Sequence, residues 1–175
     1  KFIPDLYKHN SSEVRREILR GILDTDGFVN LHGQPALQQT SKRLANDVTW
    51  IVQSLGGYVL THRKQANTSI RFIAGHPFQS NYDCYSQSIV IENGQQLFAY
   101  SQKRDKCRPR GKAATRKFRS VELVRREEAQ CISVPGGLYL TDNFIVTHNT
   151  LREYREEAME STVCPLASSA EISVA

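Results

Sequence analysis

The chain lacks any apolar run that approaches the roughly 18 residues of a membrane-spanning helix, although 39% of its 175 residues are hydrophobic. Its first residues, Lys1-Phe2-Ile3-Pro4, include neither an initiator Met nor the charged-then-apolar layout of a signal peptide. The sequence therefore predicts a soluble, cytoplasmic protein without a membrane partner. It also favours an internal piece of a longer product.

Cysteines are few and far apart. The four of them, at positions 84, 107, 131 and 164, form no Cys-x-x-Cys pair. Such spacing argues against a zinc site and against a disulfide framework, and it suits a reducing compartment.

Positive charge is concentrated in one segment. Residues 103–126 hold eleven Lys or Arg and two acidic residues, so they carry +9 in a chain whose net charge is +5. A localised basic segment is typical of a phosphate-binding surface, and the alternative is a solvated loop. Arg108, Arg110 and Lys112 are the residues of this segment that we expect to contact DNA.

Two amphipathic helices are predicted. The first begins at Ser11 or Ser12, either of which is a good N-cap, and ends at Gly27. The second covers residues 41–55 and stops at Gly56-Gly57. A further helix is predicted to open at Asn93-Gly94 and to continue through residue 100.

Short alternating stretches predict strands at residues 28–31, 36–40, 58–62, 69–74 and 86–91. The first two flank the turn-like residues 32–35, and the next two are expected to pair with each other. Residues 104–119 contain little apolar sequence, which favours a linker or a DNA-contacting loop. Residues 129–134, 138–141 and 144–147 are three more short strands, which indicate a compact β unit.

Residues 19–27, LRGILDTDG, resemble the motif of the LAGLIDADG homing endonucleases, and residues 2–7 resemble the lead-in that this family places before its second motif copy. Gly21 in mid-helix costs up to about 1 kcal/mol relative to Ala, a cost that a close approach of another helix would explain. The resemblance implies an αββαββα half-domain over residues 1–120 that acts on double-stranded DNA. A second motif copy must come from elsewhere.

Two acidic residues end this motif. Asp24 and Asp26 lie at a helix C-terminus, where the macrodipole disfavours negative charge, so their clustering favours a nearby cation. Mg²⁺ is the expected cofactor of the nuclease, because carboxylates, waters and phosphate oxygens are its usual ligands. By the resemblance, Asp26 is the catalytic acid that holds the metal, whereas Asp24 is a cap or interface group. The alternative is that both aspartates merely end a helix.

Phosphodiester cleavage also needs a cation near the scissile phosphate and a polar group that orients water. By the resemblance, Lys103 is the active-site lysine, and the alternative is a solvated lysine. Gln38 or Gln39 on the second strand is the candidate for the polar group. Gln38, Arg63 and Arg71 are further expected DNA contacts. The residues do not distinguish an active nuclease from a degenerate one.

Residues 131–134, CISV, and 138–150, LYLTDNFIVTHNT, resemble the last two conserved blocks of inteins. The resemblance implies a small all-β splicing (Hint-type) segment over residues 121–149 and a tail of host protein, the C-extein, over residues 150–175. The predicted fold class is therefore α+β, and the predicted activity is self-catalysed protein splicing, which needs no cofactor.

Splicing chemistry matches the order of three consecutive residues. The side-chain amide of Asn149 can attack its own carbonyl carbon, close a succinimide and release the peptide that begins at Thr150. His148 is the expected proton donor. Thr150 supplies the hydroxyl that accepts the upstream acyl group.

Cys131 falls where inteins often have an Asp or Cys that assists acyl transfer, and a buried structural Cys is the alternative. Gly137 stands where many inteins carry a His, so proton handling depends on another residue. The first-residue nucleophile is absent, so splicing requires an N-terminal intein part, in cis or in trans. Thr150-Leu151 would suit an insertion inside a phosphate-binding Gly-Lys-Thr loop of the host.

A DNA-binding regulator of LAGLIDADG descent without catalysis is the alternative function. Only the His148-Asn149-Thr150 ending separates the two from sequence, because a regulator has no use for it.

Overall fold

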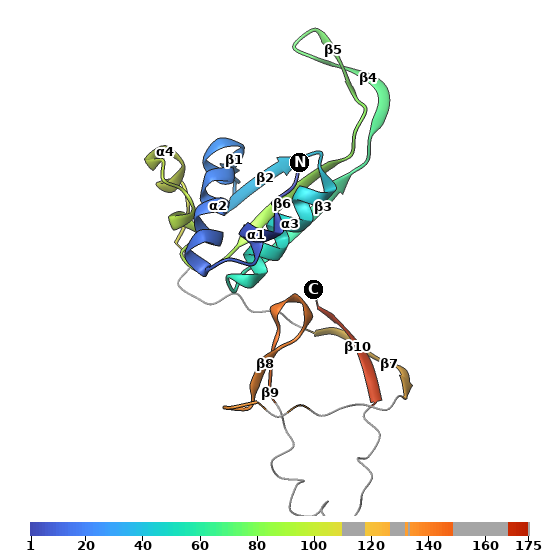
Figure 1. The fold of residues 1–175 in the computed structure, drawn as a ribbon. Coiled ribbons are helices and arrows are strands. Elements are labelled where there is room, and N and C mark those ends of the chain that lie inside the picture. Colours follow the sequence, from blue (N-terminus) through green and yellow to red (C-terminus); the bar gives the residue numbers. More distant parts are fainter. Residues whose placement is uncertain (110–117, 127–131, 133, 149–167, 175) are drawn as a thin grey trace, which may run out of the picture. The chain divides into compact units, whose positions relative to one another are not determined.

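The computed structural model describes residues 1–109, 118–126, 132, 134–148 and 168–174, and the chain divides into two compact units, Lys1–Ala114 and Thr115–Ala175 (Figure 1). Helices and small antiparallel sheets occur together, which confirms the α+β class. The expected boundary at residue 120 lies within the second unit. Among the described residues, no helix is long and apolar enough to cross a membrane.

The first unit is built on a four-stranded antiparallel sheet in the order β1-β2-β6-β3. Its strands are β1 (Gly27–Val29), β2 (Pro35–Gln39), β3 (Tyr58–Lys64) and β6 (Cys84–Val90). Helices α2 (Ser12–Thr25) and α3 (Lys42–Ser54) cover one face of this sheet, and a short helix α1 (Asp5–Lys8) precedes them (Figure 1).

Both long helices are confirmed. They could be predicted because local signals in the sequence set their ends. Ser11 accepts a hydrogen bond from the backbone N–H of Val14 at 3.4 Å, and Ser41 accepts one from Leu44 at 3.2 Å. At the other end of α2, a Cβ at Gly27 would lie 2.6 Å from the carbonyl oxygen of Leu23. Only glycine therefore allows the chain to turn directly from α2 into β1.

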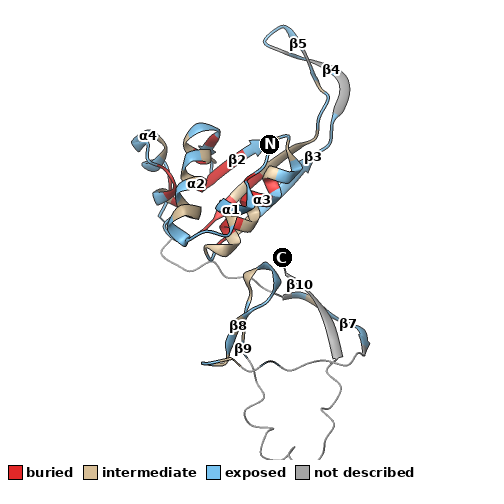
Figure 2. Cartoon of the chain, viewed as in Figure 1, coloured by how far each residue is buried: buried red, intermediate tan, exposed pale blue. Residues whose placement is uncertain are grey.

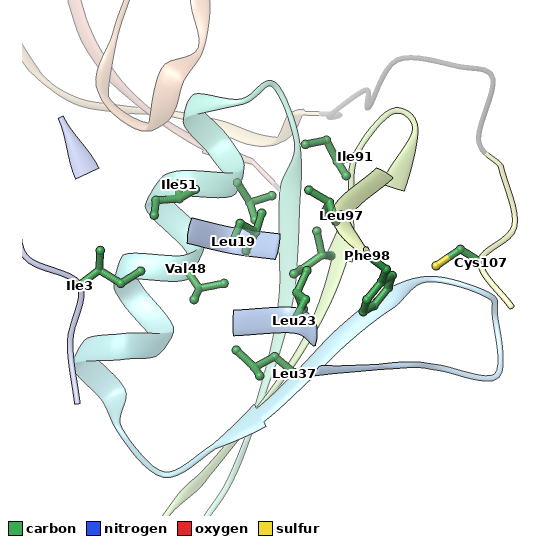
Figure 3. Packing of buried hydrophobic residues seen from close by; sticks show 12 residues of the cluster. Ile3, Leu19, Leu23, Leu37, Val48, Ile51, Ile91, Leu97, Phe98 and Cys107 are labelled. Carbon is green, nitrogen blue, oxygen red and sulfur yellow. The ribbon is translucent and has the colours of Figure 1, made fainter. Parts of the chain in front are cut away.

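One apolar cluster joins the helices to the sheet (Figure 3). Leu19 and Leu23 of α2 meet Val48, Ile51 and Val52 of α3, and the cluster also contains Ile3, Leu37, Ile89, Ile91, Leu97, Phe98 and Cys107. Burying each leucine contributes about 1.5–3 kcal/mol. Burial raises the pKa of the Cys107 thiol, so this thiol stays protonated and packs as an apolar group.

The expected pairing of residues 58–62 with 69–74 is wrong. Strand β3 pairs with β6, while β4 (Asn67–Ile73) pairs with β5 (His76–Ser80), and this β4–β5 ribbon projects beyond the sheet (Figure 1). The turn between β4 and β5 is formed by Ala74 and Gly75, both with positive φ. Short-range alternation could not show this turn, because Ala is rare in the left-handed region.

The helix expected over residues 93–100 is also wrong. A 3-10 turn, η1 (Gly94–Leu97), is followed by the short helix α4 (Ser101–Arg104). Between them Phe98 is extended, with φ −122° and ψ 127°, and it is buried together with Leu97. Burial of both side chains in the core outweighs continuation of the helix. Of residues 104–119, expected as a linker or loop, Arg104 ends α4, residues 105–109 form neither helix nor strand, and residues 118–119 begin β7. Cys107 in this loop is buried.

The described residues of the second unit form two strand pairs. Strand β7 (Phe118–Arg126) pairs antiparallel with β10 (Ser168–Val174), and β8 (Leu138–Leu140) pairs with β9 (Val146–His148) across the 3-10 turn η2 (Asp142–Phe144). The strand predicted over 138–141 is confirmed, whereas the one predicted to begin at residue 144 begins at Val146. Most of the strand expected at residues 129–134 lies outside the described residues. The β7–β10 pair was not predicted.

Candidate functional sites

Asp26 lies at the C-cap of α2, and its side chain is exposed. It lines an open hollow of about 510 Å³ together with Gln38 and Gln39 of β2. The remaining lining comes from Lys1, Ile22, Leu37, Thr40, Ser41 and Leu44. The structure thus places Asp26, the acid predicted to hold the metal, in the same hollow as Gln38 and Gln39, the two candidates for the polar group.

Gln39, one of the residues that line the hollow, has an unsatisfied side-chain oxygen. Its Nε2 donates to Gln87 Oε1 at 3.1 Å, but its Oε1 is a buried acceptor without a hydrogen-bond partner among the described residues. A buried unsatisfied acceptor costs about 1–3 kcal/mol. A water that reaches this oxygen would remove that cost.

The oxygen atoms around the hollow could supply part of the ligands of a Mg²⁺ ion that is shared with a partner, but not a complete metal site. No group of three or more His, Cys, Asp or Glu residues that could hold a metal occurs in the described part of the chain. Mg²⁺ keeps several waters and is usually held by one or two carboxylates plus substrate phosphates. Asp26 with a neighbouring amide oxygen therefore suits one half of such a site.

The other motif aspartate has a different role. The Asp24 carboxylate accepts hydrogen bonds from the backbone N–H of Ala99 at 3.1 Å and of Tyr100 at 3.5 Å. It therefore ties the end of α2 to the segment that leads into α4. This agrees with the expectation that Asp24 is a cap or interface group.

Lys103 of α4 lies against the C-terminal end of α2, where its ammonium group faces backbone carbonyls. Its Nζ donates to the carbonyl oxygens of Leu23, Asp24 and Gly27 at 3.0, 2.7 and 2.7 Å. An ammonium group has three donors, so all three are used, and the positive charge lies at the negative end of the helix dipole. Lys103 is not among the residues that line the hollow.

The face of the sheet turned away from the helices is polar. Gln87 of β6 is fully buried and donates to Ala45 O and Thr49 Oγ1 of α3, so residues in register with it face the helices. One residue further along each strand, Gln38, Ser86 and His62 are in register and share the opposite face. Gln38 donates to Ser86 Oγ at 3.4 Å.

This open face includes residues that the sequence reasoning missed. Ser88 of β6 accepts a hydrogen bond from Asn30 Nδ2 at 3.2 Å, and His62 and Lys64 are exposed on β3 (Figure 2). The available signal was the alternation of small polar residues with buried ones along residues 84–90. Amide, hydroxyl and imidazole groups on one face can hydrogen-bond to base edges and phosphates.

The predicted basic contacts occupy different places. Arg63 on β3 pairs with Asp83, with 2.6 Å between Nη2 and Oδ2. Arg71 lies on β4, and its side chain is not described. The backbone N–H of Arg108 donates to Gly33 O at 2.9 Å, and its side-chain stem lies against Gly33 in the β1–β2 turn. Arg110 and Lys112 lie outside the described residues.

The β8–β9 hairpin ends at His148. Leu138, Tyr139 and Leu140 pair with His148, Thr147 and Val146, respectively. Thr141 closes the hairpin, because its N–H and its hydroxyl both donate to Ile145 O, at 2.9 and 3.2 Å. The ring of His148 lies against Gly137. Asn149 and Thr150, which follow in the sequence, and Cys131 lie outside the described residues.

No protein-family model matches the chain. Over 158 residues it is 31% identical to a protein of Mycobacterium intracellulare described as replicative DNA helicase DnaB. The match covers 86% of this chain and 26% of that protein, so the chain spans about a quarter of the length of the curated relative it matches.

Proposed function

We propose that the chain is the C-terminal part of an intein, which contains half of a LAGLIDADG-type endonuclease and ends at Asn149, with the cytoplasm as its expected location. Residues 150–175 are then the beginning of the downstream host protein. The observation that carries this proposal is the β8–β9 hairpin, whose last paired residue, His148, directly precedes Asn149 and Thr150. A hairpin closed by Thr141 holds the strand end in place, which makes an intramolecular attack effective.

The proposed reaction uses groups of the chain itself. The hydroxyl of Thr150 first attacks the terminal carbonyl carbon of the upstream host segment. An ester to Thr150 forms, the bond between that segment and the first intein residue breaks, and the hydroxyl proton passes to the leaving group. The Asn149 amide nitrogen then attacks its own backbone carbonyl carbon, the bond to the Thr150 nitrogen breaks, and His148 supplies the proton to that nitrogen. The freed amine finally attacks the ester and joins the two host segments through an amide bond.

The comparison with the helicase supports an insertion in a host protein. The match covers 86% of this chain, whereas residues 150–175 make up only 26 of its 175 residues. The similarity must therefore include most of residues 1–149. A protein described as a helicase thus contains a segment similar to the proposed intein.

We further propose that the host is a nucleoside-triphosphate-driven DNA motor and that Thr150 belongs to its phosphate-binding loop. Such loops end in Gly-Lys followed by Ser or Thr, and the hydroxyl of that residue binds Mg²⁺. Thr150 would then serve splicing first and the host afterwards. Sequencing the residues upstream of the intein tests this, because Gly-Lys should immediately precede it.

Product analysis tests the splicing proposal. The chain, combined in cis or in trans with the N-terminal part of its polypeptide, should yield a joined host protein and an excised segment that ends in a succinimide at residue 149. Intact mass and tandem mass spectrometry identify both products. An Asn149-Thr150 bond that survives in correctly folded protein contradicts the proposal.

For the endonuclease half, we propose that Asp26 holds one side of a shared Mg²⁺ site and that Gln38 and Gln39 position water and DNA beside it. When bound, Mg²⁺ would supply positive charge next to the phosphoryl oxygens, where charge builds up during cleavage. Exposed Gly21 leaves α2 open to a second motif helix, which would bring the second acid. Lys103 fixes the carbonyl end of α2 and therefore the position of Asp26.

Double-stranded DNA is the proposed partner of the open sheet face. Gln38, Ser86 and His62 offer hydrogen-bonding groups in one row, which suits base-edge contacts. The basic residues at the start of the 103–126 segment would contact phosphates, which fix position without reading sequence.

Cleavage assays on the full-length polypeptide separate this proposal from a regulator without catalysis. Asp26→Asn should abolish Mg²⁺-dependent cutting while DNA binding persists. Asp24→Asn is the matched control, because its amide oxygen can still accept from Ala99 and Tyr100, and it should retain cutting. Full cutting by Asp26→Asn would contradict the assigned role. A parent protein that binds DNA but never cuts it would instead favour the regulator.

A further inference from the structure

The ring of His148 occupies the space in which a side chain at residue 137 would begin. Gly137 has a φ of +71°, and an ideal Cβ built on it would lie 3.0 Å from His148 Nε2 and 3.5 Å from both Cδ2 and Cε1. A Cβ rarely comes as close to another atom as 3.0 Å, so the ring would have to move. The hydrogen of Gly137 is therefore what leaves room for the ring.

The backbone fixes both partners of this contact. Leu138 pairs with His148 in the hairpin, so residue 137 stands directly beyond that pair. The N–H of Gly137 donates to Val134 O at 3.0 Å, which closes the turn that leads into β8. Neither residue can move away along the chain without breaking the β8–β9 register. A Cβ at residue 137 must therefore shift the imidazole by a few tenths of an ångström, and a longer side chain adds further atoms against the ring.

We propose that Gly137 is a positioning residue for His148. By carrying no side chain, it lets the imidazole lie across the end of the hairpin, on the residue that directly precedes Asn149 in the sequence. This inference rests on the proposed splicing function. It predicts that any side chain at residue 137 slows release of the Thr150 amine, because the proton donor is displaced. The imidazole of His148 then lies where a side chain of residue 137 would otherwise lie.

The adjacent glycine provides a matched control. Gly136 also has a positive φ, +79°, but a Cβ built on it meets no described atom within 4 Å. Asn is one of the residues that best tolerate this backbone region, so Gly136→Asn and Gly137→Asn carry similar backbone costs. Only the second variant places atoms against the His148 ring.

The experiment measures the rate at which the fragment beginning at Thr150 is released, by mass spectrometry, from the chain combined with its N-terminal intein part. Gly137→Asn should slow release by up to about 100-fold, the loss that a misplacement by about 1 Å can cause. The pH dependence of release should shift as well, because the surroundings of the imidazole change. Gly136→Asn should keep both the parent rate and the parent pH profile.

A double-mutant cycle isolates the contact from folding effects. With His148→Ala the ring is gone, so Gly137→Asn should cause no further slowing. A cross-strand NMR contact between Tyr139 and Thr147 shows that each variant keeps its hairpin. The inference is overturned if the two Asn variants behave alike, or if Gly137→Asn slows release equally with and without the ring. A parent that releases no such fragment overturns the proposed splicing function, and this inference with it.

Discussion

The carboxylate of Asp47 holds the N-terminal segment against helix α3. It is only 6% exposed, and it accepts hydrogen bonds from the backbone N–H of Ile3 at 2.9 Å and from Lys8 Nζ at 3.0 Å. Lys8 also pairs with the exposed Asp5. Because a buried charge needs its partners, this small network fixes the lead-in to α2 and buries Ile3 in the core.

Replacing Asp47 should therefore destabilise the first unit. Asp47→Ala leaves the backbone N–H of Ile3 without its acceptor and leaves the Lys8 ammonium with only the exposed Asp5 as partner, which should lower the free energy of unfolding by about 1–3 kcal/mol. Urea unfolding followed by the fluorescence of Trp50, the chain's single Trp, measures this unit. Asp5→Ala removes the exposed partner of the same lysine and should change little. Equal effects of the two variants would contradict the network described here.

Two glycines of the motif, Gly21 within α2 and Gly27 at the start of β1, have opposite requirements. Gly27 cannot take a Cβ, because the Leu23 carbonyl oxygen would lie 2.6 Å away, whereas a Cβ at Gly21 would meet no described atom within 4 Å. Gly21 is exposed in mid-helix, where it weakens α2, and no described residue packs closely enough against it to require a glycine.

Gly21→Ala should stabilise the first unit by about 0.5–1 kcal/mol, since Ala favours helix interiors over Gly. If a second motif helix packs on this face, the same methyl group should reduce DNA cutting by the full-length polypeptide. Trp50 fluorescence in urea and a cleavage assay measure the two effects separately. Greater stability with unchanged cutting would show that no helix backbone comes close to residue 21.

The ribbon β4–β5 is fastened at its base by Asp83. This carboxylate accepts from the N–H of Ala66 at 2.9 Å and pairs with Arg63. The Ala66 N–H, followed by the Arg63 guanidinium, lowers the pKa of Asp83 below its usual 3.8. A lowered pKa means that the carboxylate contributes stability above pH 3.8 and loses it as the pH falls through the folded-state pKa.

Amide exchange at Ala66 should therefore accelerate when the pH falls below 3.8, beyond the intrinsic pH dependence of exchange. Asp83→Asn has no charge to titrate, so its protection at Ala66 should be lower and independent of pH over the same range. Identical exchange profiles for parent and variant would exclude Asp83 as the group that fastens the ribbon.

Elements set by local signals were predictable, and those set by distant contacts were not. Helices α2 and α3 follow from their serine caps and apolar spacing. The structure of residues 94–104 was not predictable from local signals. Leu97 and Phe98 are buried in the core, and Asp24 accepts a hydrogen bond from the backbone of Ala99, 75 residues along the chain. Strands β7 and β10 pair across more than forty residues, which alternation within either strand does not reveal.

The sites divide in the same way. The resemblance of residues 19–27 to the motif was the basis for choosing Asp26 as the metal-holding acid. Asp26 lies near Gln38 and Gln39 because the chain turns directly from α2 into β1, which lies beside β2. The three carbonyl partners of Lys103 come from the other end of the unit's sequence, so the sequence could not show that its ammonium caps α2. The contact between Gly137 and His148 likewise depends on the hairpin register.

At the level of the whole chain, the basic segment contrasts with the rest of the sequence. It carries +9, which leaves the remaining residues net negative in a chain of +5. Part of this segment is anchored, since Cys107 is buried and the N–H of Arg108 binds the β1–β2 turn. Basic side chains near that anchor would contact the DNA backbone, and each phosphate contact releases counterions.

Neutralising Arg108, Arg110 and Lys112 together should weaken binding to all DNA sequences alike. The slope of log affinity against log salt should become less steep by up to about 3, roughly one for each lost phosphate contact. Salt titrations of parent and triple variant by fluorescence anisotropy measure this. An unchanged slope would mean that these side chains are merely solvated.

Self-cleavage after Asn149 is the central claim, and the Asn149→Ala variant tests it most directly. Alanine has no side-chain amide, so no succinimide can form, although the hydroxyl of Thr150 can still accept the upstream acyl group. Combined with its N-terminal part, the variant should accumulate a branched or N-terminally cleaved species and release no fragment that begins at Thr150. His148→Ala should slow this release about 10²- to 10⁴-fold without abolishing it. Mass spectrometry of the two mixtures decides the question, and release of that fragment from Asn149→Ala at the parent rate would contradict the account.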